Sequence, residues 1–166
     1  MIVKTVPERR RVTAAADREP RPYLLDTSAL FSFIEDEAGA DRVGQALEQT
    51  TTLLPWPVIL ELHYITLREK GEGEACRRTA LVRRLAVRIL WDMDESTVLT
   101  AARLKAEHRL SLADAIIAAF ALRWDAVLLH KDPEFETLKG LVVMEALPYR
   151  TVVGGAGGQE SPRGPG

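Results

Sequence analysis

Apolar residues along this chain occur in two kinds of run, which alternate. Short continuous runs bounded by polar or turn-forming residues are typical of buried strands, and they cover residues 23–25, 52–54, 87–90, 126–129 and 141–144. Between them, apolar positions recur every three or four residues, which predicts amphipathic helices over residues 29–49 (divided at Gly39), 55–70, 74–85, 95–108 and 112–123. This alternation predicts an α/β fold with a mostly parallel central sheet, in which the wholly apolar 126–129 run is typical of a central strand.

The predicted folded body is a single domain that covers about residues 23–149 of the 166. The segment before it, residues 1–22, carries three arginines at 9–11 and three prolines, whereas residues 151–166 hold six glycines and two prolines. Neither segment has enough apolar residues to offset the entropy of ordering it. We therefore expect a flexible basic N-terminal extension and a flexible C-terminal tail.

Composition and charge exclude several classes of protein. The single cysteine, Cys76, rules out an intramolecular disulfide and a cysteine-based zinc site. The formal net charge of −2 argues against a wholly basic nucleic-acid binder. No apolar run approaches the roughly 18 residues of a membrane span, and the first residues lack the apolar region of a secretory signal. We therefore expect a cytoplasmic protein with no membrane segment.

Four carboxylates stand at strand ends or in the first turns of helices, which is where parallel α/β sheets place their active sites. Asp26 directly follows the first predicted strand, and Asp132 comes shortly after the fourth. Glu61 and Asp114 lie in predicted helices with apolar residues on both sides, where an unpaired carboxylate is costly. One shared cation site explains the four acids together, although Glu61 could instead be a solvated residue on an apolar turn.

Three of these acids also fit helix capping. Asp26 can cap the helix that follows it, and Ser111 and Asp114 have the spacing of a capping box. Asp132 precedes Pro133, as an N-cap residue does before a proline in the first helical turn. The capping and catalytic interpretations coexist, because a serine that caps the helix can also orient Asp114.

A site made only of carboxylates selects hard divalent ions, Mg²⁺ or Mn²⁺. Without an ion, clustered carboxylates raise one another's pKa and destabilise the fold. With one or two ions bound, such a cluster can activate a water and stabilise charge on a phosphodiester oxygen. The acidic set therefore indicates phosphoryl chemistry, of which nucleases are the largest class.

Four segments resemble the motifs of PIN-domain nucleases, in the family's order and at its spacing: LLDTSAL at 24–30, PVILEL at 57–62, LSLADAIIAA at 110–119 and LLHKDPEF at 128–135. The likeness is greatest to VapC-type toxins of bacterial toxin–antitoxin systems and covers about residues 23–149. The resemblance implies an α/β/α sandwich and Mg²⁺- or Mn²⁺-dependent cleavage of RNA. It also implies a homodimer held inactive by a cognate antitoxin, whose tail occupies the acidic groove.

The resemblance assigns roles to individual residues. The catalytic acids and metal ligands would be Asp26, Glu61, Asp114 and Asp132. The supporting residues that hold these carboxylates in place would be Thr27, Ser28, Ser111 and, in the position where the family usually has Thr or Ser, His130.

Two alternatives stay open. The histidine at position 130 favours a PIN-fold module that binds RNA or acts as a scaffold without catalysis. A strand that ends in Asp26-Thr27 also resembles haloacid-dehalogenase-like phosphatases, but that family has a second Asp where this chain has Ser28.

A basic region lies between residues 68 and 88, with seven Lys or Arg against three Glu. Arg77, Arg84 and Arg88 would share one helix face if the predicted helix continued that far. Such a face could bind RNA phosphates; a solvated face and a contact with an antitoxin are the alternatives.

Overall fold

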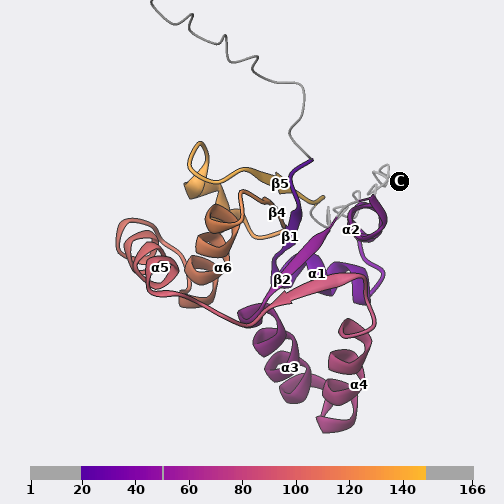
Figure 1. The fold of residues 1–166 in the computed structure, drawn as a ribbon. Coiled ribbons are helices and arrows are strands. Elements are labelled where there is room, and N and C mark those ends of the chain that lie inside the picture. The colour runs from indigo at the N-terminus through magenta and orange to yellow at the C-terminus, as the bar shows by residue number, and fades with distance from the viewer. Residues whose placement is uncertain (1–19, 50, 149–166) are drawn as a thin grey trace, which may run out of the picture.

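The computed structural model describes residues 20–49 and 51–148, in which strands and helices alternate along the chain (Figure 1). The predicted flexible ends, residues 1–22 and 151–166, lie outside the described residues except for 20–22, and so do the arginines at 9–11. No helix in the described ranges is both long enough and apolar enough to cross a membrane.

Within the described residues, five strands form one sheet in the order β3-β2-β1-β4-β5, and every pairing is parallel. Their bounds are Tyr23–Leu25 (β1), Thr52–Pro55 (β2), Val87–Leu90 (β3), Val127–His130 (β4) and Met144–Ala146 (β5). The predicted α/β fold with a parallel sheet is therefore confirmed. The central strand is β1 rather than the predicted 126–129 run, because β5 pairs on the outer side of β4.

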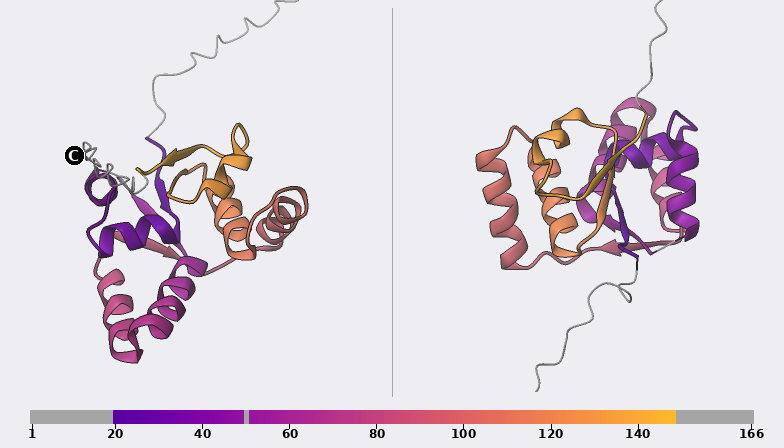
Figure 2. Two further views of the ribbon diagram at one scale, coloured as in Figure 1. Left: turned by 180° about the vertical axis from the view of Figure 1, so that it is seen from behind. Right: turned by 90° about the horizontal axis from the view of Figure 1, so that it is seen from above.

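Helices cover both faces of the sheet, which makes the predicted α/β/α sandwich. Figure 2 shows α5 and α6 on one face and α1 and α2 on the other, while α3 and α4 extend together beyond the sheet. The helices are Thr27–Ile34 (α1), Ala40–Gln49 (α2), Trp56–Lys70 (α3), Glu72–Val82 (α4), Glu95–Glu107 (α5) and Leu112–Arg123 (α6). A short 3-10 helix, η1, covers Pro133–Leu138.

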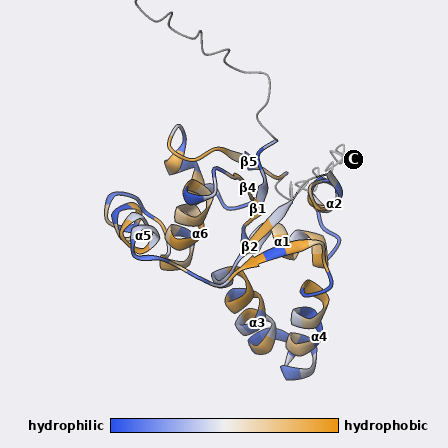
Figure 3. Cartoon of the chain, viewed as in Figure 1, coloured by the Kyte–Doolittle hydropathy of each residue, from blue (hydrophilic) through white to orange (hydrophobic). Residues whose placement is uncertain are grey.

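The core lies between the sheet and these helices. The strand residues Leu24, Leu54 and Leu128 are fully buried, as expected for a parallel sheet covered on both faces. Helix α6 is buried over most of its length around Phe120, and Figure 3 shows apolar residues on the sheet and α6, with more hydrophilic ones on the outer helix α5. This core packs against the strands whose ends lie at the edge where the acidic residues gather.

Several predicted bounds shift by a few residues in the structure, and two of these shifts have a reason in the backbone hydrogen bonds. The predicted helix 74–85 ends at Val82, because Arg84 and Leu85 donate their N–H groups three residues back and the chain then turns into β3. The last strand begins at Met144 rather than at 141, because Leu141 and Val142 both donate to the Leu138 carbonyl and so complete the turn after η1.

Candidate active site

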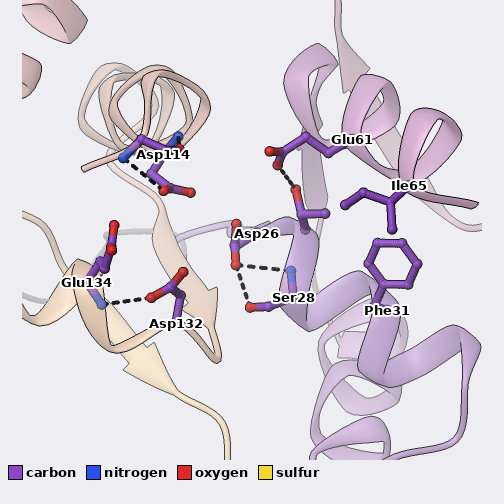
Figure 4. Close-up of a pocket in the computed structure, with 10 residues that line it drawn as sticks. Asp26, Ser28, Phe31, Glu61, Ile65, Asp114, Asp132 and Glu134 are labelled. Carbon is purple, nitrogen blue, oxygen red and sulfur yellow. Dashed lines mark hydrogen bonds between the residues drawn. The ribbon is translucent and has the colours of Figure 1, made fainter. Parts of the chain in front are cut away.

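A hollow of about 430 Å³ lies at the carboxyl edge of the sheet (Figure 4). Strands β1 and β4 end side by side there, since the Asp26 N–H donates to the Leu129 carbonyl at 3.0 Å. The lining residues come from four helices, α1, α3, α6 and η1, and from the residues just before them: Asp26, Thr27, Ser28, Phe31, Glu61, Ile65, Ser111, Asp114, Asp132 and Glu134. The structure thus places all four predicted acids and three of the four predicted supporting residues around one hollow.

Asp26 is the most buried of these acids, with 2% of its surface exposed. It caps α1, because its Oδ2 accepts the Ser28 N–H at 3.1 Å and the Ser28 hydroxyl at 2.5 Å. Burial raises the pKa of the Asp26 carboxyl from its ordinary value of 3.8 to about 7; the Ser28 hydroxyl opposes this change and the charge of Asp114 adds to it. Near neutral pH this carboxyl is therefore protonated part of the time.

Glu61 is held by a contact between two distant elements. The hydroxyl of Thr27, the first residue of α1, donates to Oε2 of Glu61 on α3 at 2.5 Å. Burial raises the pKa of the half-buried Glu61 carboxyl, the hydrogen bond from Thr27 opposes that change, and the charge of Asp114 adds to it. Like Asp26, this carboxylate is less stable in its charged form than it would be in water.

Asp114 and Asp132 cap α6 and η1, two of the helices that line the hollow. Asp114 forms a complete capping box with Ser111: its N–H donates to the Ser111 Oγ at 3.0 Å, and the Ser111 N–H donates to its Oδ2 at 3.2 Å. Asp132 caps η1 by accepting the Glu134 N–H at 2.8 Å. The predicted capping roles are confirmed, and the same side chains line the hollow (Figure 4).

Comparison with known proteins identifies the family. A family model described as the PIN domain matches residues 23–141, well over half of the chain. The chain belongs to the PIN domain family. This confirms the resemblance that the four motifs carry and excludes the haloacid-dehalogenase alternative. No curated protein sequence matches the chain.

Three solved structures with a similar fold are toxins or toxin–antitoxin complexes. VapBC2 from Rickettsia felis, bound to promoter DNA, has a TM-score of 0.64 and 16% identity over 76% of this chain and 98% of that one. VapBC-1 from nontypeable Haemophilus influenzae has a TM-score of 0.60 and 22% identity over 75% and 96%. Mycobacterium tuberculosis VapC20, named as a sarcin-ricin loop cleaving toxin, has a TM-score of 0.57 and 18% identity over 76% and 99%. At these identities the likeness shows a shared fold, and the family assignment rests on the PIN domain match.

His130 does not line the hollow of this PIN domain. It is fully buried, its ring packs edge-on against Phe135, and its Nδ1 lies 2.8 Å from the backbone oxygen of Asp132. Since a carbonyl oxygen only accepts, Nδ1 carries the proton and donates. His130 therefore holds the backbone of the turn that carries Asp132, and its Nε2 lies 3.7 Å from Oε1 of Glu136, which does not line the hollow.

The three arginines predicted to bind RNA do not share a helix face. Arg77 lies on α4 and pairs with Glu74 at 2.7 Å, whereas Arg84 follows the end of that helix. Arg88 lies on β3, with its guanidinium 4.6 Å from the centre of the Trp124 ring. The shared-face premise is wrong, because the chain leaves the helix at Val82 to enter β3. The three arginines remain predicted RNA contacts only.

Sequence reasoning missed three residues that line the hollow. Glu134 adds a fifth carboxylate, while Phe31 and Ile65 form an apolar wall. Glu134 follows Asp132 by two residues, but its position in the first turn of a short helix gives no signal of where its side chain lies. Phe31 and Ile65 belong to ordinary apolar helix patterns, so the sequence offers no way to separate them from core residues.

The carboxylate oxygens that line the hollow are the kind of ligand that a hard divalent ion prefers. Within residues 20–49 and 51–148, no three histidine, cysteine or carboxylate side chains are placed so that they could hold one ion directly. Mg²⁺ keeps several waters and takes one or two carboxylates directly, so a hollow of about 430 Å³ lined by five carboxylates fits its needs. The raised pKa values of Asp26 and Glu61 reflect charges that a cation would stabilise.

Proposed function

We propose that this PIN-domain protein is a divalent-metal-dependent endoribonuclease that acts as the toxin of a toxin–antitoxin pair. The observation that supports this most is the convergence of Asp26, Glu61, Asp114 and Asp132 on one hollow from four separate parts of the chain. Helix capping alone would account for three of these acids, but it would not explain why all four line the same hollow. The VapC-type fold and PIN domain membership favour RNA as the substrate.

The chain's own residues would bind and orient the reacting groups. Asp26, Glu61, Asp114 and Asp132 would hold Mg²⁺ or Mn²⁺, and an ion bound there supplies charge neutralisation and lowers the pKa of a water. The hydroxyls of Thr27 and Ser28 each occupy one carboxylate oxygen, which fixes the direction of Glu61 and Asp26. Because the metal-free Asp26 carboxyl has a pKa of about 7, ion binding would release a proton from it.

The direct test is cleavage of labelled RNA by the purified protein, with and without Mn²⁺. Wild type should cut only with the ion, and Asp26→Asn should lose at least a hundredfold in rate. Asp92→Asn, which removes an exposed carboxylate outside the hollow, is the matched control and should cut like wild type. RNA left intact at every metal tried, or equal cleavage by Asp26→Asn, would overturn the proposal.

A second candidate is a PIN-fold module that binds RNA without cutting it. The absence of a ready-made set of three ion ligands among the described side chains favours it. The same experiment separates the two functions, since this module would retain RNA on a filter and leave it uncut with every ion.

The proposed partners are a cognate antitoxin and a second copy of the chain. Two of the solved neighbours described above are named as VapBC proteins, which supports an antitoxin as the partner of this chain. Because the proposed substrate is RNA, we also propose that the pair acts in the cytoplasm. Leu60, Tyr64 and Leu67 are exposed at successive turns along one side of α3. An apolar stripe of this kind is typical of an interface, which supports a homodimer.

A further inference from the structure

A second hollow, of about 410 Å³, adjoins the acidic one along α1. Three residues line both hollows: Ser28, Phe31 and Asp132. The remaining walls of the second are Ser32, Glu37, Lys131 and Pro133. Among the described residues that line the two hollows, Lys131 is the only cation. Each hollow has the volume of a small-ligand site.

Lys131 is tied to the acidic site through its backbone. Its N–H donates to the Ser28 Oγ at 2.8 Å, and the Ser28 hydroxyl in turn donates to Asp26. The lysine side chain then runs along α1 to Ser32, one helical turn or about 5.4 Å beyond Ser28. The ammonium is thereby held at a set displacement from the catalytic acids.

The lysine ammonium is nearly buried and incompletely bonded. Its side chain is 12% exposed, and Nζ lies 3.2 Å from the Ser32 Oγ and 3.1 Å from Oε2 of Glu37. The Ser32 hydroxyl donates to the Ser28 carbonyl, so towards the lysine it acts as an acceptor. An ammonium has three N–H donors, which leaves one for a ligand oxygen in the second hollow.

An aromatic ring forms the wall between the two hollows. Phe31 lines both, and the guanidinium of Arg78 lies 5.9 Å from the centre of its ring. Arg78 is itself buried and paired with Glu35 and Glu74 at 2.8 Å, which fixes its guanidinium beside the ring. Rings in such positions can stack on nucleic-acid bases without sequence preference.

We propose that the second hollow is a subsite for the nucleotide next to the scissile phosphate, with the Lys131 ammonium bound to its phosphate. This inference rests on the proposed function. Successive phosphates of a stacked strand lie about 3.4 Å apart along its axis, and they lie farther apart in an extended strand. The Lys131 ammonium lies about one helical turn, or about 5.4 Å, from the end of α1 that carries Asp26, which is comparable to this spacing. In the free protein the Glu37 carboxylate occupies the place of a phosphate oxygen on the lysine.

The opposing explanation is a purely structural contact. The ion pair between Lys131 and Glu37 joins the end of β4 to the loop after α1, and it could serve only to hold these segments together. The two explanations differ in their effect on RNA affinity. A tether affects the melting temperature alone, whereas a phosphate ligand changes the RNA affinity and its dependence on salt.

The test measures binding of a fluorescent single-stranded RNA by anisotropy over a series of salt concentrations. All variants carry Asp26→Asn, so that the RNA stays intact, and melting curves confirm that each is folded. Lys131→Met should raise the Kd about five- to tenfold and reduce the salt slope by about 0.7, the value for one phosphate contact on a single strand. Lys131→Arg should bind like the parent.

Two further variants complete the design. Glu37→Gln removes the competing carboxylate and keeps the lysine, so it should lower the Kd severalfold. Lys139→Met removes an exposed lysine that lines neither hollow and should leave affinity and slope unchanged.

Three outcomes would overturn the inference. If Lys131→Met or Glu37→Gln lowers the melting temperature while the Kd and salt slope match the parent, the contact is a tether. If Lys139→Met weakens binding as much as Lys131→Met, the effect is one of overall charge. In both cases cleavage by wild type leaves the proposed function standing. If wild type neither binds nor cuts RNA, the proposed function fails and the subsite fails with it.

Discussion

The burial of Asp26 predicts that the metal-free protein loses stability as the pH rises towards neutrality. A carboxyl whose pKa is higher in the folded than in the unfolded chain contributes most to stability below its unfolded value, here 3.8, and this contribution is lost as the pH rises to the folded value, about 7. Each pKa unit corresponds to about 1.4 kcal/mol. The free energy of unfolding should therefore fall by about 3 kcal/mol between pH 4 and pH 7 on account of this group.

Asp26→Asn isolates this contribution. Asparagine caps helices as well as aspartate does, and its amide oxygen can still accept from Ser28, but it carries no charge at any pH. The free energy of unfolding of the variant minus that of wild type should rise by about 4 kcal/mol between pH 4 and pH 8. This corresponds to a rise of roughly 10 °C in the difference between the two melting temperatures. Added Mn²⁺ should stabilise wild type more than the variant and so narrow the gap.

Urea unfolding in EDTA at several pH values measures this difference. Subtracting wild type from Asp26→Asn cancels the opposite pH dependence of groups such as Glu35 and Asp94, whose pKa values are lowered, the first by its hydrogen bond from Lys70 and the second by that from Thr97. Asp92→Asn, which removes an exposed carboxylate outside the hollow, is the control variant. A difference that stays constant from pH 4 to pH 8 would refute the reasoning, because Asp26 would then titrate alike in the folded and unfolded chain.

Three further predictions concern the ion, the supporting hydroxyl and the dimer. Mn²⁺ should bind more tightly as the pH rises from 6 to 8, because Asp26 must lose its proton; calorimetry that finds a pH-independent affinity contradicts this. Thr27→Val removes the hydrogen bond to Glu61 and should lower the cleavage rate about tenfold or more while the protein stays folded. Thr27→Ser keeps a hydroxyl and should cleave at the wild-type rate. Equal cleavage rates for the two variants would show that the hydroxyl is not used. Tyr64→Lys with Leu67→Lys should convert a dimer to a monomer in sedimentation velocity, and an unchanged sedimentation coefficient would remove α3 from the interface.

Local signals in the sequence were enough to place most of the elements. Helix α6 begins and ends as predicted, at Leu112 and Arg123, because Ser111 and Asp114 form a capping box whose spacing is visible in the sequence. Helix α3 ends at Lys70 as predicted, since Gly71 takes a φ of +85° that other residues rarely adopt. The order of strands and helices likewise followed from the apolar periodicity alone.

The bounds that failed depend on where the chain goes next. Val82 ends α4 because the following residues must turn into β3, and Leu141 completes a turn before β5 begins. Apolar residues near both positions fit either element equally well. The sequence also gave no sign that β1 is the central strand. Strand order depends on which edge of the sheet each later strand pairs with, and β4 and β5 both add on the side of β1 opposite to β2.

By itself, the sequence determined the family of this protein, its parallel α/β architecture and four acids at strand ends and helix starts, because each of these depends on residues close together in the chain. Only the tertiary structure decided what those acids meet. Thr27 reaches Glu61 across 34 positions, and Lys131 reaches Ser28 across 103. The raised pKa of Asp26 likewise reflects burial by the whole fold together with the charge of Asp114. Burial and electrostatics sum over neighbours in space, and those neighbours exist only once the sheet and helices have packed.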